Sequence, residues 1–137
     1  MRSRRRANST SHGIRHEPFL SGSRSLKRIW KALFYSLDGL AAAFKYEEAF
    51  RLEVLLALVL APIALHTHVS GVGKALLIGS LLLVLITELL NSAIEAVTDR
   101  ISLEEHVLAK RAKDFGSAAV MLSVINVPVV WLLVLTG

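Results

Sequence analysis

The sequence predicts an all-α membrane protein, in which an amphipathic surface helix precedes three transmembrane helices. Hydrophobic residues make up 53% of the 137 positions, the mean hydropathy is +0.53, and three long apolar runs alternate with charged segments. This is too apolar for an ordinary small soluble domain, whose surface carries mostly charged and polar groups. The chain has no cysteine, which excludes disulfides and cysteine-ligated metal sites.

Residues 1–24 are polar, basic and rich in serine. No apolar segment of the signal-peptide type follows the arginines, so we do not expect a secretory signal. The segment has too few apolar side chains to form a core, and we expect it to be disordered and attracted to anionic lipid. The chain is therefore divided into a disordered basic extension over residues 1–24 and a membrane domain over residues 25–137.

The first predicted helix covers residues 25–46. Apolar side chains recur there at steps of three and four, as at Leu26, Ile29, Trp30 and Leu33. Charged side chains fall elsewhere around the helical wheel, which is typical of an amphipathic helix on a membrane surface. An ordinary helix that covers the membrane bundle would show the same pattern.

Three apolar runs follow, over residues 50–66, 75–97 and 116–135. A helix needs about 20 residues to cross a bilayer, so each run predicts a span, although the first is short. Pro62 and Pro128 lie inside the first and third runs. Membrane helices tolerate such prolines when neighbouring groups satisfy the freed carbonyls.

The lysines and arginines predict the orientation. They gather before the first span and in the loop predicted between the second and third spans, which holds Arg100, Lys110, Arg111 and Lys113; the other loop offers Lys74. This bias predicts a cytoplasmic N-terminus and a C-terminus on the far side. The net charge of +5 is explained in this way, and no basic platform interleaved with aromatic residues indicates nucleic-acid binding.

Four polar residues interrupt or end the second span, at Glu88, Asn91, Glu95 and Asp99. Their steps of three, four and four place them on one face of a helix. An ionisable side chain within a bilayer costs at least a few kcal/mol, which favours a functional site. The structural alternative is hydrogen bonding between subunits. Because so small a chain offers few partners for these groups, we expect a homo-oligomer.

The stretches EEAFRLE, ELLNSAIEAVTDR and AKRAKDFGSAAV resemble the prokaryotic diacylglycerol kinases. The resemblance extends from about Leu26 to the C-terminus. It implies a homotrimeric helical bundle in the bacterial inner membrane. It also implies an enzyme that uses Mg²⁺ and transfers the γ-phosphate of ATP to the primary hydroxyl of diacylglycerol, giving phosphatidic acid and ADP.

The resemblance implies roles for particular residues. Glu88 corresponds to the catalytic proton acceptor, with Asn91 and Asp99 in the same catalytic group, and Glu47 and Glu95 correspond to metal ligands. The ATP contacts correspond to Arg28, Tyr35, Glu47, Glu95, Glu104, Glu105, His106, Lys113 and Asp114. The lipid-substrate contacts correspond to Arg28, Phe50, Arg51, Glu53, Glu88 and Ser117. Leu37, Ala41 and Leu52 depart from residues common in the family, which weakens the lipid assignments and leaves the acidic group intact.

Three alternatives stay open from the sequence. An undecaprenol kinase of the same family is the first, although that branch commonly has alanines at residues 115–117. A small ion-coupled transporter would also place carboxylates within a span, but it would need no residues for ATP. A purely structural membrane protein would tolerate the loss of Glu88.

Overall fold

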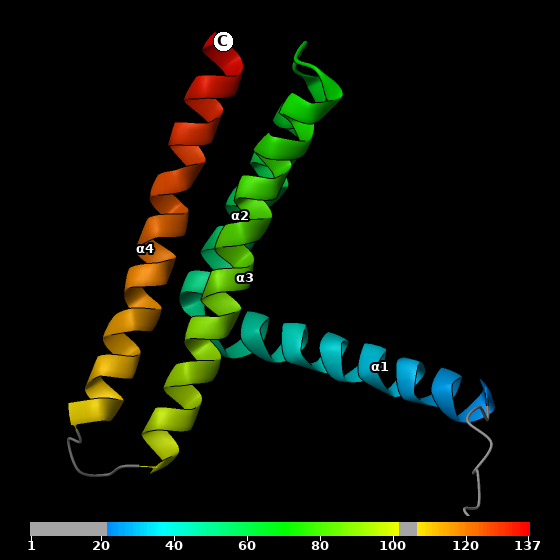
Figure 1. The fold of residues 1–137 in the computed structure, drawn as a ribbon, viewed down its shortest axis with the longest axis vertical. Coiled ribbons are helices and arrows are strands. Elements are labelled where there is room, and N and C mark those ends of the chain that lie inside the picture. The colour runs from blue at the N-terminus through cyan, green and yellow to red at the C-terminus, as the bar shows by residue number, and fades with distance from the viewer. Residues whose placement is uncertain (1–21, 102–106) are drawn as a thin grey trace, which may run out of the picture. The chain divides into compact units, whose positions relative to one another are not determined.

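The computed structural model describes residues 22–101 and 107–137, and it folds these ranges into helices (Figure 1). The helices are α1 (Gly22–Tyr46), α2 (Glu48–His66), α3 (Gly71–Ile101) and α4 (Val107–Thr136). No strand occurs in the two described ranges. The all-α prediction is therefore confirmed, with one helix before three apolar ones. Most of the basic extension predicted over residues 1–24 lies outside the described residues.

Helices α2, α3 and α4 are each long and apolar enough to cross a membrane, which confirms the three predicted spans. At a rise of 1.5 Å per residue, the 31 residues of α3 and the 30 of α4 extend about 45 Å. This exceeds the hydrocarbon thickness of about 30 Å. Both prolines lie inside their helices, Pro62 in α2 and Pro128 in α4.

The boundaries of α3 and α4 differ from the predicted spans. Helix α3 begins at Gly71 rather than residue 75, and α4 begins at Val107 rather than residue 116. Lys110, Arg111 and Lys113 therefore lie on α4, and the prediction that they lie in a loop is wrong. Hydropathy marks the apolar middle of a helix, but alanine, lysine and arginine also favour helix, and they extend the polar start of α4.

Helix α1 has the apolar surface that its sequence predicts. Side chains such as Leu26, Ile29 and Leu33 are exposed, and the Trp30 and Phe34 rings lie 6.4 Å apart between centroids. The helix crosses the boundary between two structural units, Met1–Phe34 and Tyr35–Gly137. The second unit contains α2, α3 and α4.

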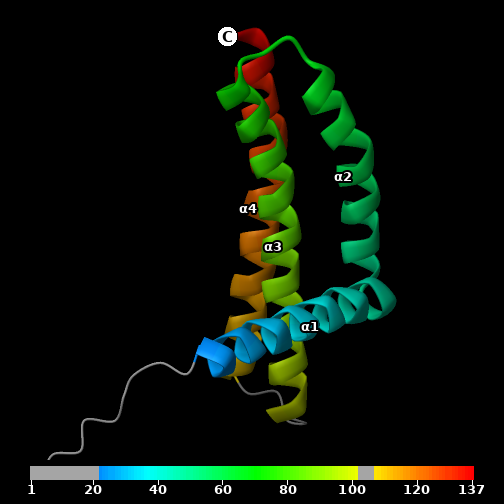
Figure 2. The same ribbon diagram turned by 90° about the vertical axis from the view of Figure 1, so that its right-hand side faces the viewer.

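Helix α3 packs against both α2 and α4, and most extensively against α4 (Figure 2). Its buried side chains, among them Leu77, Leu81 and Val84, form much of the core. The Thr87 hydroxyl lies 2.7 Å from the Ser123 hydroxyl and joins the two helices through a polar contact. Helix α3 is thus the central element, and it carries the acidic stripe formed by Glu88, Asn91, Glu95 and Asp99.

The turn between α2 and α3 is held by hydrogen bonds to helix ends. The Lys74 ammonium donates to the Leu65 carbonyl at 2.7 Å, and the Gly73 amide donates to the Ser70 hydroxyl at 3.1 Å. A side chain on Gly73 would press on Val134 near the end of α4, at 3.1 Å. The turn is therefore packed closely against the C-terminal end of α4.

Candidate active site

Four carboxyl groups, two on α3 and two on α2 or at its start, influence one another. Glu88 on α3 interacts electrostatically with Glu95 on the same helix and with Glu47 at the start of α2, and Glu53 on α2 interacts with Glu88. Glu88 is the most deeply placed of the stripe, with 6% of its surface exposed. Like charges gathered in this way create a negative field that attracts cations.

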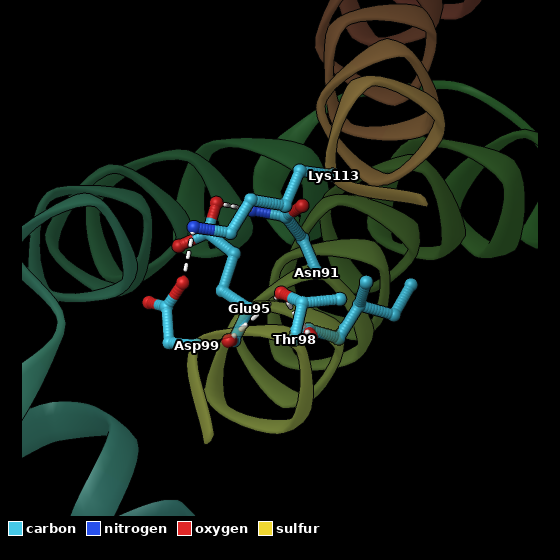
Figure 3. A network of polar contacts seen from close by, with 6 residues as sticks. Asn91, Glu95, Thr98, Asp99 and Lys113 are labelled. Atoms are coloured by element: carbon cyan, nitrogen blue, oxygen red, sulfur yellow. Dashed lines mark hydrogen bonds and ion pairs between the residues drawn. The ribbon is translucent and has the colours of Figure 1, made fainter. Parts of the chain in front are cut away.

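Asn91 links the stripe to helix α4. Its amide nitrogen donates a hydrogen bond of 3.2 Å to a carboxylate oxygen of Glu95, one helical turn away (Figure 3). Its carbonyl oxygen is buried and finds no hydrogen-bond partner among the described residues. That oxygen lies against Gly116 of α4, where an added Cβ would collide with it. Asn91 therefore orients Glu95 while its other end is fixed by the neighbouring helix.

At the end of the stripe, Asp99 forms an ion pair with Lys113 (Figure 3). The pair joins α3 to α4, and the Lys113 ammonium also interacts electrostatically with Glu95. Both partners are partly exposed, at 66% for Asp99 and 39% for Lys113. The sequence assigned these two residues to different roles, and the structure brings them into contact. The result is a mixed-charge end of the site, open to solvent.

Glu47 occupies the joint between α1 and α2. It is the single extended residue between the two helices, with φ −102° and ψ 116°, and its side chain makes no capping hydrogen bond. The Arg51 guanidinium bonds the carbonyls of Phe44 and Lys45, at 3.3 and 3.2 Å. Those carbonyls lie at the end of α1, where a helix leaves carbonyls without partners. Arg51 therefore has a structural role that the sequence assignment to lipid did not include.

The other residues assigned to lipid fall in different environments. Phe50 is buried, with 4% of its surface exposed, and Ser117 is exposed on α4. One carboxylate oxygen of Glu53 is buried and finds no partner among the described residues. Glu53 lines a cavity of about 290 Å³ between α2, α3 and α4; the other lining residues are Leu56, Ala57, Leu60, Leu81, Val84, Val124, Val127 and Pro128. Glu53 is thus the one charged residue among the apolar residues that line this cavity.

The residues assigned to ATP are placed less completely. Arg28 and Tyr35 are exposed on α1, and Asp114 is exposed on α4 beside Lys113. Glu104, Glu105 and His106 lie outside the described residues. Among the residues that the sequence assigns to ATP, Lys113 is therefore the one from α4 that lies near Glu95.

Gly116 is the residue near the site that sequence reasoning missed. Glycine inside a helix destabilises it by about 1 kcal/mol relative to alanine, so its presence in the helical run GSAAV is a signal that space is needed there. The sequence does not show which residue of α3 contacts Gly116, because this contact depends on how α3 and α4 are aligned.

The donor set fits magnesium. Mg²⁺ prefers hard oxygen ligands, keeps several waters, and is held by one or two carboxylates together with substrate phosphates. Among the residues in the described ranges, no three acidic or histidine side chains are close enough to enclose a metal by themselves. The carboxyl groups of Glu47 and Glu95 are half-buried and both interact with Glu88, and their number matches the one or two carboxylates with which proteins hold Mg²⁺.

Comparison with known proteins identifies the family. The family model described as "Prokaryotic diacylglycerol kinase" matches residues 34–135. The diacylglycerol kinase of Pseudomonas aeruginosa is 52% identical over 120 residues, covering 88% of this chain and 97% of the relative. The diacylglycerol kinase of Escherichia coli K12 is 49% identical over 79% of this chain and 88% of its own length. The diacylglycerol kinase of Haemophilus influenzae is 50% identical over 71% of this chain and 82% of its own length. With three apolar helices and matches over most of its length, this membrane protein belongs to the prokaryotic diacylglycerol kinase family.

Proposed function

We propose that this chain is a diacylglycerol kinase, which transfers the γ-phosphate of Mg-ATP to the primary hydroxyl of diacylglycerol and gives phosphatidic acid and ADP. The observation that carries the proposal is the polar stripe within a membrane-spanning helix, in which Glu88 and Asn91 are buried and Glu95 is half-buried. Its relatives bear the name diacylglycerol kinase, which supports the same reaction.

In this proposal Glu88 is the proton acceptor. The lipid hydroxyl oxygen forms a bond to the γ-phosphorus as the bond from that phosphorus to the bridging oxygen of ADP breaks, and the hydroxyl proton passes to the Glu88 carboxylate. Glu88 lies seven residues from Glu95, or about 10 Å along α3. A carboxylate at this depth suits a hydroxyl held at the surface of the apolar layer.

We assign Glu47 and Glu95 to the magnesium ion. Bound magnesium neutralises phosphate charge, which is a main requirement of phosphoryl transfer. Asn91 orients Glu95 through the hydrogen bond described above. Lys113 supplies a positive charge for the phosphates, and Asp99 holds that ammonium beside the stripe. We assign Arg28, Tyr35, Asp114 and residues 104–106 to the nucleotide on the strength of the resemblance.

For the lipid, we assign Glu53 and the apolar cavity beside it to the end of the substrate that approaches Glu88. The remaining lipid assignments are Arg28, Phe50, Arg51 and Ser117, again by resemblance. In this arrangement ATP approaches from the polar ends of α3 and α4, and the lipid approaches from the bilayer.

We also propose a homotrimer in the bacterial inner membrane, with the N-terminus in the cytoplasm and the C-terminus on the far side. Exposed apolar side chains cover α2 and α4, which suits both lipid and subunit contacts. The distribution of lysine and arginine supports the orientation. Crosslinking in mild detergent is expected to give trimers, and a monomer as the sole species would contradict the assembly.

The test of function is a lipid phosphorylation assay on the purified protein, with diacylglycerol and undecaprenol offered in parallel mixed micelles. We expect phosphatidic acid as the main product when ATP and magnesium are present. If undecaprenol is phosphorylated and diacylglycerol is not, the protein is an undecaprenol kinase. If neither substrate gives a phosphorylated lipid, the kinase assignment is wrong. The carboxylates would then need another role, such as ion coupling.

A further inference from the structure

Gly116 and Asn91 form a contact that depends on the absence of a side chain. Gly116 is buried on α4, and a Cβ built on it would collide with the Asn91 carbonyl oxygen and lie 3.3 Å from Asn91 Cγ. The backbone of Asn91 is farther away, with Cα at 3.7 Å, which is an ordinary contact distance. The conflict would therefore fall on the Asn91 side chain and not on the packing of the two backbones.

Asn91 has little freedom to yield without changing Glu95. The side chain is 8% exposed, and its amide nitrogen is bonded to Glu95. Its carbonyl oxygen already lacks a hydrogen-bond partner among the described residues, so it is positioned by packing against Gly116. Moving that oxygen rotates the amide and displaces the donor from Glu95.

We propose that Gly116 is a positioning residue for magnesium binding, which seats Asn91 against α4 so that the Asn91 amide holds the Glu95 carboxylate. This inference rests on the proposed function, in which Glu95 is a magnesium ligand. Loss of a partner that orients a metal ligand typically weakens metal affinity about 10- to 100-fold. Gly116→Ala is therefore expected to raise the magnesium concentration for half-maximal Mg-ATP binding by a factor in this range, while the KM for lipid stays unchanged.

Gly79→Ala is the matched control. Gly79 lies on α3, outside the candidate site, and a Cβ there would meet nothing within 4 Å. Both variants place the same methyl group in a long helix, so any shared effect reports helix propensity. We expect Gly79→Ala to leave the magnesium requirement at the wild-type value.

A double-mutant cycle with Asn91→Ala tests the contact without relying on activity. Thermal unfolding of the wild type, Gly116→Ala, Asn91→Ala and the double variant is measured in the same detergent. We expect Gly116→Ala to lower the unfolding midpoint when Asn91 is present, and to show only the helix-propensity effect seen in Gly79→Ala when alanine replaces Asn91. If Gly116→Ala alone fails to fold, recovery of folding in the double variant supports the proposal.

Two results would overturn the inference. One is a loss of stability from Gly116→Ala that is equal in both backgrounds, since the methyl group would then conflict with something other than Asn91. The other is an unchanged magnesium requirement in folded Gly116→Ala. A wild-type protein that phosphorylates no lipid would refute the proposed function separately, while the unfolding cycle and the magnesium titration would still decide the role of Gly116.

Discussion

The hydroxyl of Thr87 lies 2.7 Å from that of Ser123 and joins α3 to α4 one residue before Glu88. Two further contacts follow along the same seam, from Asn91 to Gly116 and from Asp99 to Lys113. Together they fix the rotation of α3 about its own axis relative to α4. The face that carries Glu88 is therefore set by polar contacts as well as by the apolar core.

The Thr87–Ser123 contact is expected to contribute modestly to stability. Hydrogen bonds between membrane helices contribute on average about 0.6 kcal/mol and at most about 1.7 kcal/mol in double-mutant cycles. Thr87→Val and Ser123→Ala are each expected to destabilise the protein within this range. The loss of stability in the double variant is expected to be smaller than the sum of the two single losses. Thr98→Val is the control, because the Thr98 hydroxyl bonds the carbonyls of Ile94 and Glu95 on its own helix. Additive losses in thermal unfolding would show that the two hydroxyls act separately.

Glu88→Gln is expected to abolish most turnover while leaving Mg-ATP binding nearly intact. The substitution preserves shape but removes the proposed proton acceptor, and general-base loss typically lowers rates about 10²- to 10⁴-fold. It also removes an ionisable group from a membrane span, so the folded state is not expected to suffer. Initial rates together with nucleotide titration provide the measurement. Near-wild-type turnover in a folded variant would exclude Glu88 as the base.

Glu47 and Glu48 provide a comparison between adjacent carboxylates. Glu47 interacts electrostatically with Glu88, whereas Glu48 is exposed in the first turn of α2. Glu47→Gln is expected to raise the magnesium requirement by roughly tenfold or more, since even partners that orient a ligand have effects of this size. Glu48→Gln is a surface change and is expected to alter stability by less than about 0.5 kcal/mol. Equal effects of the two substitutions on magnesium titrations would argue against Glu47 as a ligand.

The Asp99–Lys113 pair can be tested by exchanging its charges. Both residues are partly exposed, so solvent screens the pair and we expect it to contribute little to stability. The double variant Asp99→Lys with Lys113→Asp restores the attraction but moves the positive charge from α4 to α3. We expect the exchange to preserve the unfolding midpoint and to leave lipid phosphorylation impaired. Recovery of full activity would mean that the pair serves only to join the helices.

Deletion of residues 1–21 is expected to leave lipid phosphorylation unchanged. The deletion leaves α1 intact from Gly22, and the family match begins at residue 34. None of the residues assigned to the reaction lies in the deleted segment. Turnover per folded protein in detergent and in vesicles containing anionic lipid is the measurement. A lower rate in detergent would reveal a role in the reaction, and a lower rate in vesicles alone would indicate a role at the membrane surface.

The fold was largely predictable from the sequence. Hydropathy marks each span because apolar side chains are stable in the bilayer, and the steps from Glu88 to Asn91 and Glu95 follow the period of a helix. The ends of α3 and α4 were not predicted, because polar residues such as Lys110 and Lys113 continue a helix without any apolar signal.

The site was predictable within one helix but not between helices. The hydrogen bond from Asn91 to Glu95 joins residues four apart, so periodicity brings them together. The contact of Asn91 with Gly116 and the ion pair of Asp99 with Lys113 depend on the alignment of α3 with α4. The bonds of Arg51 to the end of α1 depend on the bend at Glu47, which no local pattern in the sequence specifies.

The one-residue joint at Glu47 restricts how the length of this chain can vary. Helical backbone bonds continue on both sides of it, from the Glu47 amide to the Ala43 carbonyl at 2.8 Å and from the Arg51 amide to the Glu47 carbonyl at 3.3 Å. Each residue added to a helix rotates the chain before it by about 100° about the helix axis and shifts that chain by about 1.5 Å along the axis. A single insertion between Glu47 and Glu48 would therefore turn the Glu47 carboxylate away from Glu88 and also remove the α1 carbonyls from the reach of Arg51. Insertions and deletions at this joint are therefore expected to disrupt both contacts at once, which no single substitution there would do.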